Sequence, residues 1–294
     1  MPKAKANNIE IEYETFGDPS GKPLLLISGL GAQMITYIPE FCDLFVKEGF
    51  YVIRFDNRDV GLSTKFDEKG VPNALEAVAK LRSKQPFEPP YHLEDMADDA
   101  VGLLDFLNIE KAHILGASLG SMIAQVVVYR HPSRVSSLIL IMGTTSNPDL
   151  PEGKPEAIQL LMTPMPSERE SYIEESVKRG KVLYGSGFPY DENLRRRLAK
   201  EAYNRCYYPD GQVRQLVAGL ANGDRRDRIK TIKVPTLVIH GQEDPLFSVE
   251  CGIDLSENIS GAKLLTINGM GHSLPPETWP EIIKAVVNNT ARTN

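Results

Sequence analysis

The stretch Gly116-Ala117-Ser118-Leu119-Gly120 is the feature around which the rest of this chain is interpreted. An apolar run at residues 112–115 precedes it, and a segment of small and apolar residues at 121–128 follows it. This order predicts a strand, a sharp turn and a helix, with the serine hydroxyl held at the carboxyl end of the strand beside the helix N-terminus. The pattern alone occurs by chance in roughly one chain in ten of this length. Its meaning therefore depends on the remaining residues.

The composition excludes several classes of protein. The chain has 294 residues, of which 41 % are hydrophobic, enough to form the core of one α/β domain with an insertion. A net charge of −6 provides no electrostatic reason to bind nucleic acid or an anionic membrane. The N-terminus is polar, and no run approaches the ~18 apolar residues of a membrane span. The three cysteines have neither metal-ligand nor disulfide-framework spacing. We therefore expect a soluble, cytoplasmic protein that acts on a small molecule and needs no cofactor or metal; its oligomeric state cannot be inferred.

The order of apolar and polar residues indicates an α/β fold. Residues 9–14 alternate apolar and polar side chains, which predicts a half-buried strand at the edge of a sheet. Continuous apolar runs, typical of strands covered on both faces, occupy residues 23–27, 51–55, 112–115, 135–142, 235–239 and 263–267. Helical spacing occupies residues 37–47, 74–80, 93–107, 249–257 and 277–288. Strands that alternate with helices predict a mostly parallel sheet flanked by helices.

Residues 144–230 interrupt this alternation, because helical patterns replace the apolar strands there. Ser167-Glu168-Arg169-Glu170 is typical of a capping box that begins a helix, and Asp191 is a second candidate N-cap. A helical block between two strands of one sheet is best explained as a cap over the carboxyl edge, where open α/β sheets bind ligands. We therefore predict a core of residues 1–143 and 231–294, with a helical cap of residues 144–230 inserted after the sixth strand.

Two later loops supply the partners that a serine nucleophile needs. A serine hydroxyl needs a base to accept its proton and an acidic group to orient that base and stabilise its charge. Asp244 follows the apolar run that ends at Ile239, and His272 follows the run that ends at Ile267. The carboxyl ends of parallel strands meet at one edge of a sheet, so both side chains are expected on the same edge as Ser118.

With these residues in place, the chain resembles the α/β hydrolases over nearly its whole length outside the cap. The matching pieces are Gly116–Gly120, the loops of Asp244 and His272 in the chain order serine, acid, histidine, and Asp56-Asn57-Arg58. Within that superfamily the chain is most similar to the anthracycline methyl esterases. The stretches that carry this likeness are residues 54–64, 185–189 and 235–245.

The resemblance implies a serine hydrolase that cleaves carboxylic esters through an acyl-enzyme. Ser118 is the implied nucleophile, His272 the base and Asp244 the acid. By the family pattern, two backbone N–H groups bind the oxyanion that forms on the attacked carbonyl. They are those of Leu119, directly after the nucleophile, and of Leu30, in the loop after an early strand.

Other residues compete for these roles. Glu243 is a rival to Asp244 as the acid. Four further histidines all precede the acid in the chain, unlike His272, and are interpreted as structural: His92, His113, His131 and His240. Asp56 and Arg58 are interpreted as an ion pair that holds a loop. The arginine-rich stretches 195–197 and 225–228 are interpreted as solvated helix surfaces rather than anion sites.

Other function classes remain open at this point. The same triad serves C–C bond hydrolysis and chemistry with peroxide as the acceptor, and the same fold serves as a receptor that binds ligand without efficient turnover. Residues 29–34 imitate a dinucleotide-binding turn, but Met34 stands where a third glycine is needed for helix packing, which disfavours nucleotide binding. The cap is expected to line a mainly apolar pocket for a medium-sized group. Its candidate lining residues are Met162, Met165, Phe188, Tyr203 and Tyr207.

Overall fold

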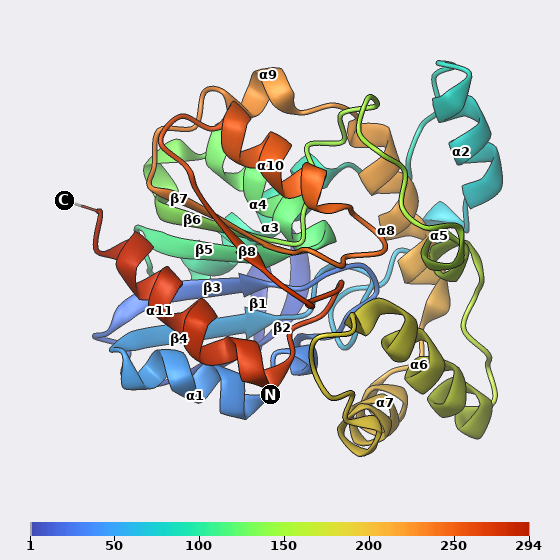
Figure 1. Cartoon of the computed structure of the whole chain (residues 1–294), viewed down its shortest axis with the longest axis horizontal. Coiled ribbons are helices and arrows are strands. Elements are labelled where there is room, and N and C mark those ends of the chain that lie inside the picture. The colour runs from blue at the N-terminus through green and yellow to red at the C-terminus, as the bar shows by residue number, and fades with distance from the viewer. Residues whose placement is uncertain (1, 294) are drawn as a thin grey trace.

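The computed structural model describes residues 2–293 and contains, within that range, one eight-stranded sheet (Figure 1). In spatial order its strands are β1 (Lys3–Ala6), β2 (Ile9–Phe16), β4 (Phe50–Phe55), β3 (Lys22–Ile27), β5 (Ala112–Ala117), β6 (Val135–Ile141), β7 (Thr236–Gly241) and β8 (Lys263–Ile267). The pairs β1–β2 and β2–β4 are antiparallel, and every pair from β4 to β8 is parallel. The predicted α/β fold with a mostly parallel sheet is confirmed.

Helices cover both faces of the sheet (Figure 1). One face packs against α3 (Leu93–Phe106), α4 (Leu119–Arg130) and α10 (Val249–Asn258), and the other against α1 (Pro39–Lys47) and α11 (Trp279–Thr290). In β3, Leu25 and Ile27 belong to the first core, while Leu24 and Leu26 belong to the second. Successive side chains of a strand point to opposite faces, so a strand between two helical layers is apolar throughout. Within residues 2–293, none of the helices combines the length and apolar character that crossing a bilayer requires.

The edge of the sheet differs from the sequence-based expectation. β1 occupies the edge and pairs with β2, with Ala4 opposite Ile11, so the strand expected at the edge over residues 9–14 lies second. Ala4 and Ala6 are buried in the core beneath α3. A four-residue strand that buries only two methyl groups carries too little apolar signal to be recognised in a sequence.

The segment between β6 and β7 is helical. It contains α5 (Pro155–Met162), α6 (Arg169–Tyr184), α7 (Glu192–Arg205), α8 (Pro209–Asn222) and α9 (Arg226–Ile229). In Figure 1, α6, α7 and α8 lie beyond the carboxyl ends of the parallel strands, and α2 (Ala74–Arg82) lies beside α8. The predicted Ser167 cap is wrong by one residue, because the Glu168 carboxylate accepts the first free N–H groups of α6. Asp191 caps α7 as predicted, by accepting the Leu194 N–H. The division into a core and a separate cap domain stays a prediction.

Two buried ion pairs attach these helices to the loop after β4. Asp56 lies 2.7 Å from Arg205 of α7, and Asp59 lies 2.8 Å from Arg214 of α8. Both carboxylates are fully enclosed, and each faces an arginine that offsets part of the cost of burying it. This loop therefore joins the sheet to the helices above it.

Arg58 of the same loop pairs with α3. Its guanidinium lies 2.6 Å from the Asp99 carboxylate of α3. The predicted ion pair between Asp56 and Arg58 is therefore wrong, although both residues hold the loop. Each side chain pairs with a different helix, and such long-range partners are not visible in the local sequence.

Candidate active site

Ser118 occupies a strained turn between β5 and α4. Its backbone has φ +55° and ψ −121°, a region that residues with a side chain rarely adopt. A Cβ on Gly116 would overlap the Gly120 carbonyl oxygen, and a Cβ on Gly120 would overlap that of Ile27. The two glycines therefore allow the strand and the helix to meet this closely, which leaves the Ser118 hydroxyl at the carboxyl end of β5.

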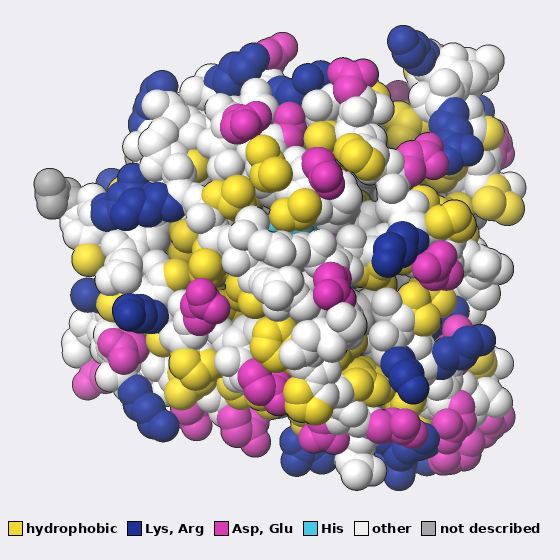
Figure 2. Space-filling view, viewed as in Figure 1, with side chains coloured by type: hydrophobic (Ala, Val, Ile, Leu, Met, Phe, Trp, Pro, Cys, Tyr) yellow, Lys and Arg dark blue, Asp and Glu magenta, His cyan; other side chains and the backbone are white. Residues whose placement is uncertain are grey.

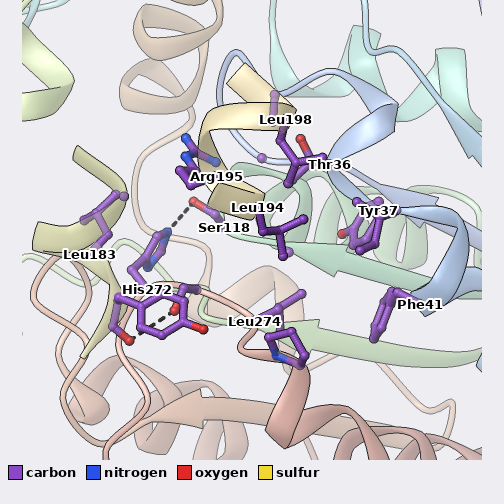
Figure 3. Close-up of a pocket in the computed structure, with 18 of the residues that line it drawn as sticks. Thr36, Tyr37, Phe41, Ser118, Leu183, Leu194, Arg195, Leu198, His272 and Leu274 are labelled. Atoms are coloured by element: carbon purple, nitrogen blue, oxygen red, sulfur yellow. Dashed lines mark hydrogen bonds between the residues drawn. The ribbon is translucent and has the colours of Figure 1, made fainter. Parts of the chain in front are cut away.

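His272 joins Ser118 to Asp244 through two hydrogen bonds. Its Nε2 lies 2.9 Å from Ser118 Oγ (Figure 3), and its Nδ1 lies 2.7 Å from Asp244 Oδ2. The three residues follow β5, β7 and β8, so three loops at one edge of the sheet supply the three side chains. The structure thus brings together the nucleophile, base and acid that the sequence indicated.

The Asp244 carboxylate is enclosed and hydrogen bonded at both oxygens. Oδ1 accepts the backbone N–H groups of Leu246 and Phe247, each at 2.9 Å, and Oδ2 faces His272. Burial alone would raise the pKa of this carboxyl, but His272 and the hydrogen bonds outweigh burial and hold the pKa below its usual value. Asp244 is therefore ionised near neutral pH. Its Oδ2 accepts a hydrogen bond from the N–H at Nδ1 of His272.

The rival acid, Glu243, has a different partner. Its carboxylate accepts the Ser186 N–H at 2.7 Å and the Ser186 hydroxyl at 2.9 Å. These hydrogen bonds hold the pKa of Glu243 below its usual value. Glu243 therefore ties the segment between α6 and α7 to the core, while its neighbour Asp244 faces His272.

The same segment contacts the loop that carries His272. The Gly187 N–H donates to the Gly269 carbonyl at 2.9 Å, and the Gly271 N–H donates to the Tyr184 carbonyl at 2.9 Å. A Cβ on Gly187 would lie 2.6 Å from Gly269 Cα, so this close backbone contact requires glycine. The helices above the sheet therefore help to position His272.

The two expected oxyanion donors lie on either side of the nucleophile. Leu119 begins α4, and Leu30 lies in the loop after β3, where a Cβ on Gly29 would be 3.2 Å from Ser118 Cβ. Asn57 holds this loop by donating to its first carbonyl at 3.0 Å. Within residues 2–293, neither leucine N–H donates to another group of the chain. Both N–H groups are therefore free to bind a developing negative charge.

Ser118 and His272 open onto a cavity of about 320 Å³ (Figure 3). Most of its wall is apolar and comes from both the core and the helices above it: Tyr37, Ile38, Phe41, Leu183, Leu194, Leu198, Leu274 and Trp279. A cavity of this size and character suits a small or medium-sized organic molecule. In the described chain, no cluster of His, Cys, Asp and Glu side chains is arranged to hold a metal ion.

The lining residues proposed from the sequence are not those that the structure uses. The cavity wall contains none of Met162, Met165, Phe188, Tyr203 and Tyr207 among the residues described. The Tyr203 ring instead packs at a tilt against Tyr172, the Tyr207 ring meets Tyr172 edge to face, and Phe188 packs against the core. That prediction is wrong because composition does not reveal which face of a helix turns toward the sheet.

Three of the remaining histidines make structural hydrogen bonds through their rings. His240 is buried, and its Nε2 lies 2.7 Å from the Phe247 carbonyl and 3.5 Å from the Asp244 carboxylate. Burial holds the pKa of His240 below its usual value. His113 bonds the hydroxyl of a neighbouring strand at 2.8 Å, and His131 bonds an α3 carboxylate at 2.7 Å. None of these contacts reaches Ser118.

Two arginines expected on solvated helix surfaces lie elsewhere. Arg225 is fully buried and donates to neutral acceptors, which include Gln125 at 2.9 Å and the Thr144 carbonyl at 2.7 Å. Burial lowers the pKa of Arg225 to about 9. Arg195 of α7 is half-buried and lines the cavity with Ser118. Both predictions are wrong because the rotation of a helix about its own axis is set by packing.

Comparison with known proteins agrees with this geometry. The model of the family described as "alpha/beta hydrolase fold" matches residues 22–277. The chain belongs to the α/β-hydrolase family. This α/β hydrolase is 28 % identical to the rhodomycin D methylesterase of Streptomyces peucetius, over 99 % of this chain and 98 % of that protein. The likeness to anthracycline methyl esterases that the sequence indicated is confirmed.

Solved structures of other hydrolases share the fold. A meta-cleavage product hydrolase from Pseudomonas fluorescens superposes with a TM-score of 0.77 at 21 % identity, over 100 % of this chain and 98 % of that one. An esterase from Exiguobacterium antarcticum superposes with a TM-score of 0.75 at 22 % identity, over 98 % of both chains. At these identities the likeness concerns the fold.

Proposed function

We propose that this α/β hydrolase cleaves a carboxylic ester, with Ser118 as nucleophile, His272 as general base and acid, and Asp244 as the group that orients His272. The observation that carries the proposal is the unbroken line of hydrogen bonds from Ser118 Oγ through His272 to Asp244, at 2.9 Å and 2.7 Å. Likeness to a rhodomycin D methylesterase supports a methyl ester as the bond that is cleaved. The apolar cavity supports an acyl part with substantial apolar surface.

In the first half of the reaction, Ser118 Oγ attacks the ester carbonyl as His272 Nε2 accepts the hydroxyl proton. The carbonyl oxygen becomes an oxyanion, which the N–H groups of Leu30 and Leu119 bind. The C–O bond to the alcohol then breaks, and the alcohol leaves with the proton held at Nε2. Asp244 stabilises the imidazolium throughout and keeps the other ring proton on Nδ1. The product is an acyl group on Ser118.

In the second half, water takes the place of the alcohol. Nε2 of His272 accepts a proton from this water as its oxygen attacks the acyl carbon, and the same two N–H groups bind the second oxyanion. The bond between the acyl carbon and Ser118 Oγ then breaks, and Oγ regains the proton from Nε2. Carboxylic acid is released, and the enzyme returns to its starting state.

The proposal is tested by turnover of methyl butanoate and 4-nitrophenyl butanoate. We expect Ser118→Ala to lower kcat by several orders of magnitude, on the order of 10⁴ or more, because the nucleophile is removed. Ser256→Ala on α10 is the matched control and should retain the wild-type rate, because the Ser256 hydroxyl donates to the exposed Ile253 carbonyl at 2.8 Å and not to a triad residue. A fluorophosphonate probe should label the wild type at Ser118 and leave Ser118→Ala unlabelled.

The opposite results separate the other classes of function. If the wild type releases no more acid than Ser118→Ala from any ester tested, the esterase proposal is wrong. Labelling of Ser118 without ester turnover would favour C–C bond hydrolysis or peroxide chemistry. An unreactive Ser118 would favour a receptor that binds ligand without efficient turnover.

A further inference from the structure

Helix α7 places a guanidinium in the cavity of the proposed active site. Arg195 shares this cavity with Ser118 and His272. In Figure 3 its guanidinium is drawn toward the Ser118 end of the cavity, while Tyr37 and Phe41 lie at the opposite end. The cavity therefore has a cationic group toward the end where Ser118 lies and apolar side chains at the other end.

Among residues 2–293, no carboxylate forms an ion pair with the Arg195 guanidinium. Its Nε donates to the Ser176 carbonyl at 3.2 Å. Within residues 2–293, its terminal nitrogens have no hydrogen-bond acceptor, and no carboxylate lies within ion-pair distance. Asp191 also lines the cavity, but its carboxylate caps α7 by accepting the Leu194 N–H at 2.9 Å. Four donor positions on the guanidinium are thus available to a ligand.

Other arginines on these helices form ion pairs, whereas Arg195 does not within the described chain. Arg205 and Arg214, which also lie on helices above the sheet, each face a buried carboxylate. Arg196, the next residue on α7, pairs with two exposed glutamates, Glu174 of α6 and Glu192 of α7. A half-buried cation against an apolar wall loses hydration, so it favours an anionic partner more strongly than a fully solvated one does.

We propose that Arg195 binds a carboxylate of the substrate, so that the preferred substrate is the monoester of a dicarboxylic acid with an apolar remainder. The inference deepens the proposed function and rests on it. A planar guanidinium matches a carboxylate through two parallel hydrogen bonds. Arg195 is the one Lys or Arg among the described residues that line the cavity, and Asp191 adds a negative charge there. A singly charged carboxylate therefore suits the site better than a doubly charged phosphate.

This arrangement also orients the substrate. The ester carbonyl lies at Ser118, the free carboxylate lies at Arg195, and the apolar part extends toward Phe41 at the other end of the cavity, where the Trp279 ring lies 5.3 Å from that of Phe41. Two fixed points and an apolar wall limit the positions of the ester bond, which increases the effective concentration of the reacting groups. Arg195 is thus a residue that determines substrate specificity rather than one that carries out a step of the reaction.

The test compares monomethyl glutarate with dimethyl glutarate, which differ at the second carboxyl by one methyl group and one charge. Acid release at constant pH gives kcat/KM for each ester, with a correction for the two equivalent bonds of the dimethyl ester. We expect the wild type to prefer the anionic ester by about 10- to 100-fold, the range of a charge-assisted hydrogen-bonded pair. The preference should decrease as salt concentration rises.

Variants on α7 assign this preference to one residue. Arg195→Met should reduce the ratio between the two esters to about one, and Arg195→Lys should keep part of it, because an ammonium retains the charge but not the planar fork. Arg197→Met is the matched control, since Arg197 is exposed on the same helix. It should keep the wild-type ratio.

A binding measurement makes the result independent of turnover. Trp279 is the single tryptophan of the chain and lines the cavity, so its fluorescence reports ligand binding. In a Ser118→Ala background, monomethyl glutarate should bind at least 10-fold more tightly than dimethyl glutarate, and adding Arg195→Met should remove the difference. Equal binding of both esters, or a preference that survives Arg195→Met, overturns the inference. If binding depends on Arg195 but the wild type turns over neither ester, the proposed function is contradicted while the proposed carboxylate site is supported.

Discussion

Replacing Asp244 with asparagine tests the catalytic proposal most directly, because the two side chains have nearly the same shape. Both Asp244 oxygens are occupied: Oδ1 accepts the N–H groups of Leu246 and Phe247 at 2.9 Å, and Oδ2 lies 2.7 Å from His272 Nδ1. In the Asp244→Asn variant the amide oxygen must remain at the Oδ1 position. In the flipped orientation the amide NH₂ would face the N–H groups of Leu246 and Phe247. Two hydrogen bonds would then be lost, and each loss would destabilise the protein by about 1–3 kcal/mol.

The expected loss of kcat in Asp244→Asn follows from this fixed orientation of the amide. The amide NH₂ then faces His272 Nδ1, which must become a hydrogen-bond acceptor, so the ring proton moves to Nε2. A protonated Nε2 cannot accept the proton of Ser118. We expect kcat of Asp244→Asn to fall by about 10⁴, as for other triads held in the wrong tautomer, which corresponds to about 5 kcal/mol of transition-state stabilisation.

The assay is ester hydrolysis measured near neutral pH, with the melting temperature of each variant recorded to show that it is folded. Glu243→Gln is the adjacent control. Glu243 bonds Ser186 at the protein surface and does not touch His272, so we expect kcat within about threefold of the wild type. The reasoning is refuted if a folded Asp244→Asn retains more than about a tenth of wild-type kcat, or if Glu243→Gln loses as much activity as Asp244→Asn.

Three further predictions concern stability. Gly120→Ala should lower the free energy of unfolding by about 3 kcal/mol or more in urea titration, because the added methyl group overlaps the Ile27 carbonyl and neither backbone segment can move. Arg214→Met should cost about 3–5 kcal/mol, because it leaves the enclosed Asp59 carboxylate without its partner; the double variant with Asp59→Asn should lose less than the sum of the two single losses. Burial lowers the pKa of His113 to about 4, so the unfolded chain binds a proton below pH ~6.5 while the folded protein does not. Stability should therefore decrease as pH falls from about 6.5 toward 4, by about 1–2 kcal/mol between pH 7.5 and pH 5, and His113→Gln should remove that part of the pH dependence.

Each of these three predictions has an outcome that contradicts it. A Gly120→Ala protein as stable as the wild type would mean that strand and helix can separate at the nucleophile turn. Strictly additive losses for Arg214→Met and Asp59→Asn would show that the two side chains do not interact. An unchanged pH dependence in His113→Gln would assign the acid sensitivity to other groups.

Charged side chains of both signs occur on the face of the molecule shown in Figure 2. In Figure 2, Lys and Arg side chains are interspersed with Asp and Glu over the face that is shown, with no broad basic region on that face. This distribution agrees with the net charge of −6. It is consistent with a protein whose recognition takes place inside a cavity.

Short-range patterns were sufficient to predict the α/β fold and the three residues of the proposed triad. The glycines at 116 and 120 define a turn within five residues, and the apolar runs before Ser118, Asp244 and His272 identify the strands from which the loops emerge. The carboxyl ends of parallel strands lie at a common edge of the sheet. Residues that directly follow such strands are therefore expected to lie close together in space, even when they are far apart in the sequence. The chain order of the three residues then limits their roles.

Long-range packing decided the features that the sequence did not reveal. The pairing of Asp56 with Arg205, and not with Arg58, depends on where α7 crosses the loop after β4. Whether Arg195 faces solvent or the cavity depends on the rotation of α7 about its axis, which contacts with α6 set. Adjacent arginines on this helix have almost the same local sequence environment, yet Arg196 points to surface glutamates while Arg195 lines the cavity. Local residue order can specify a turn or a strand, but the partner of a long side chain is chosen by the segments that fold against it.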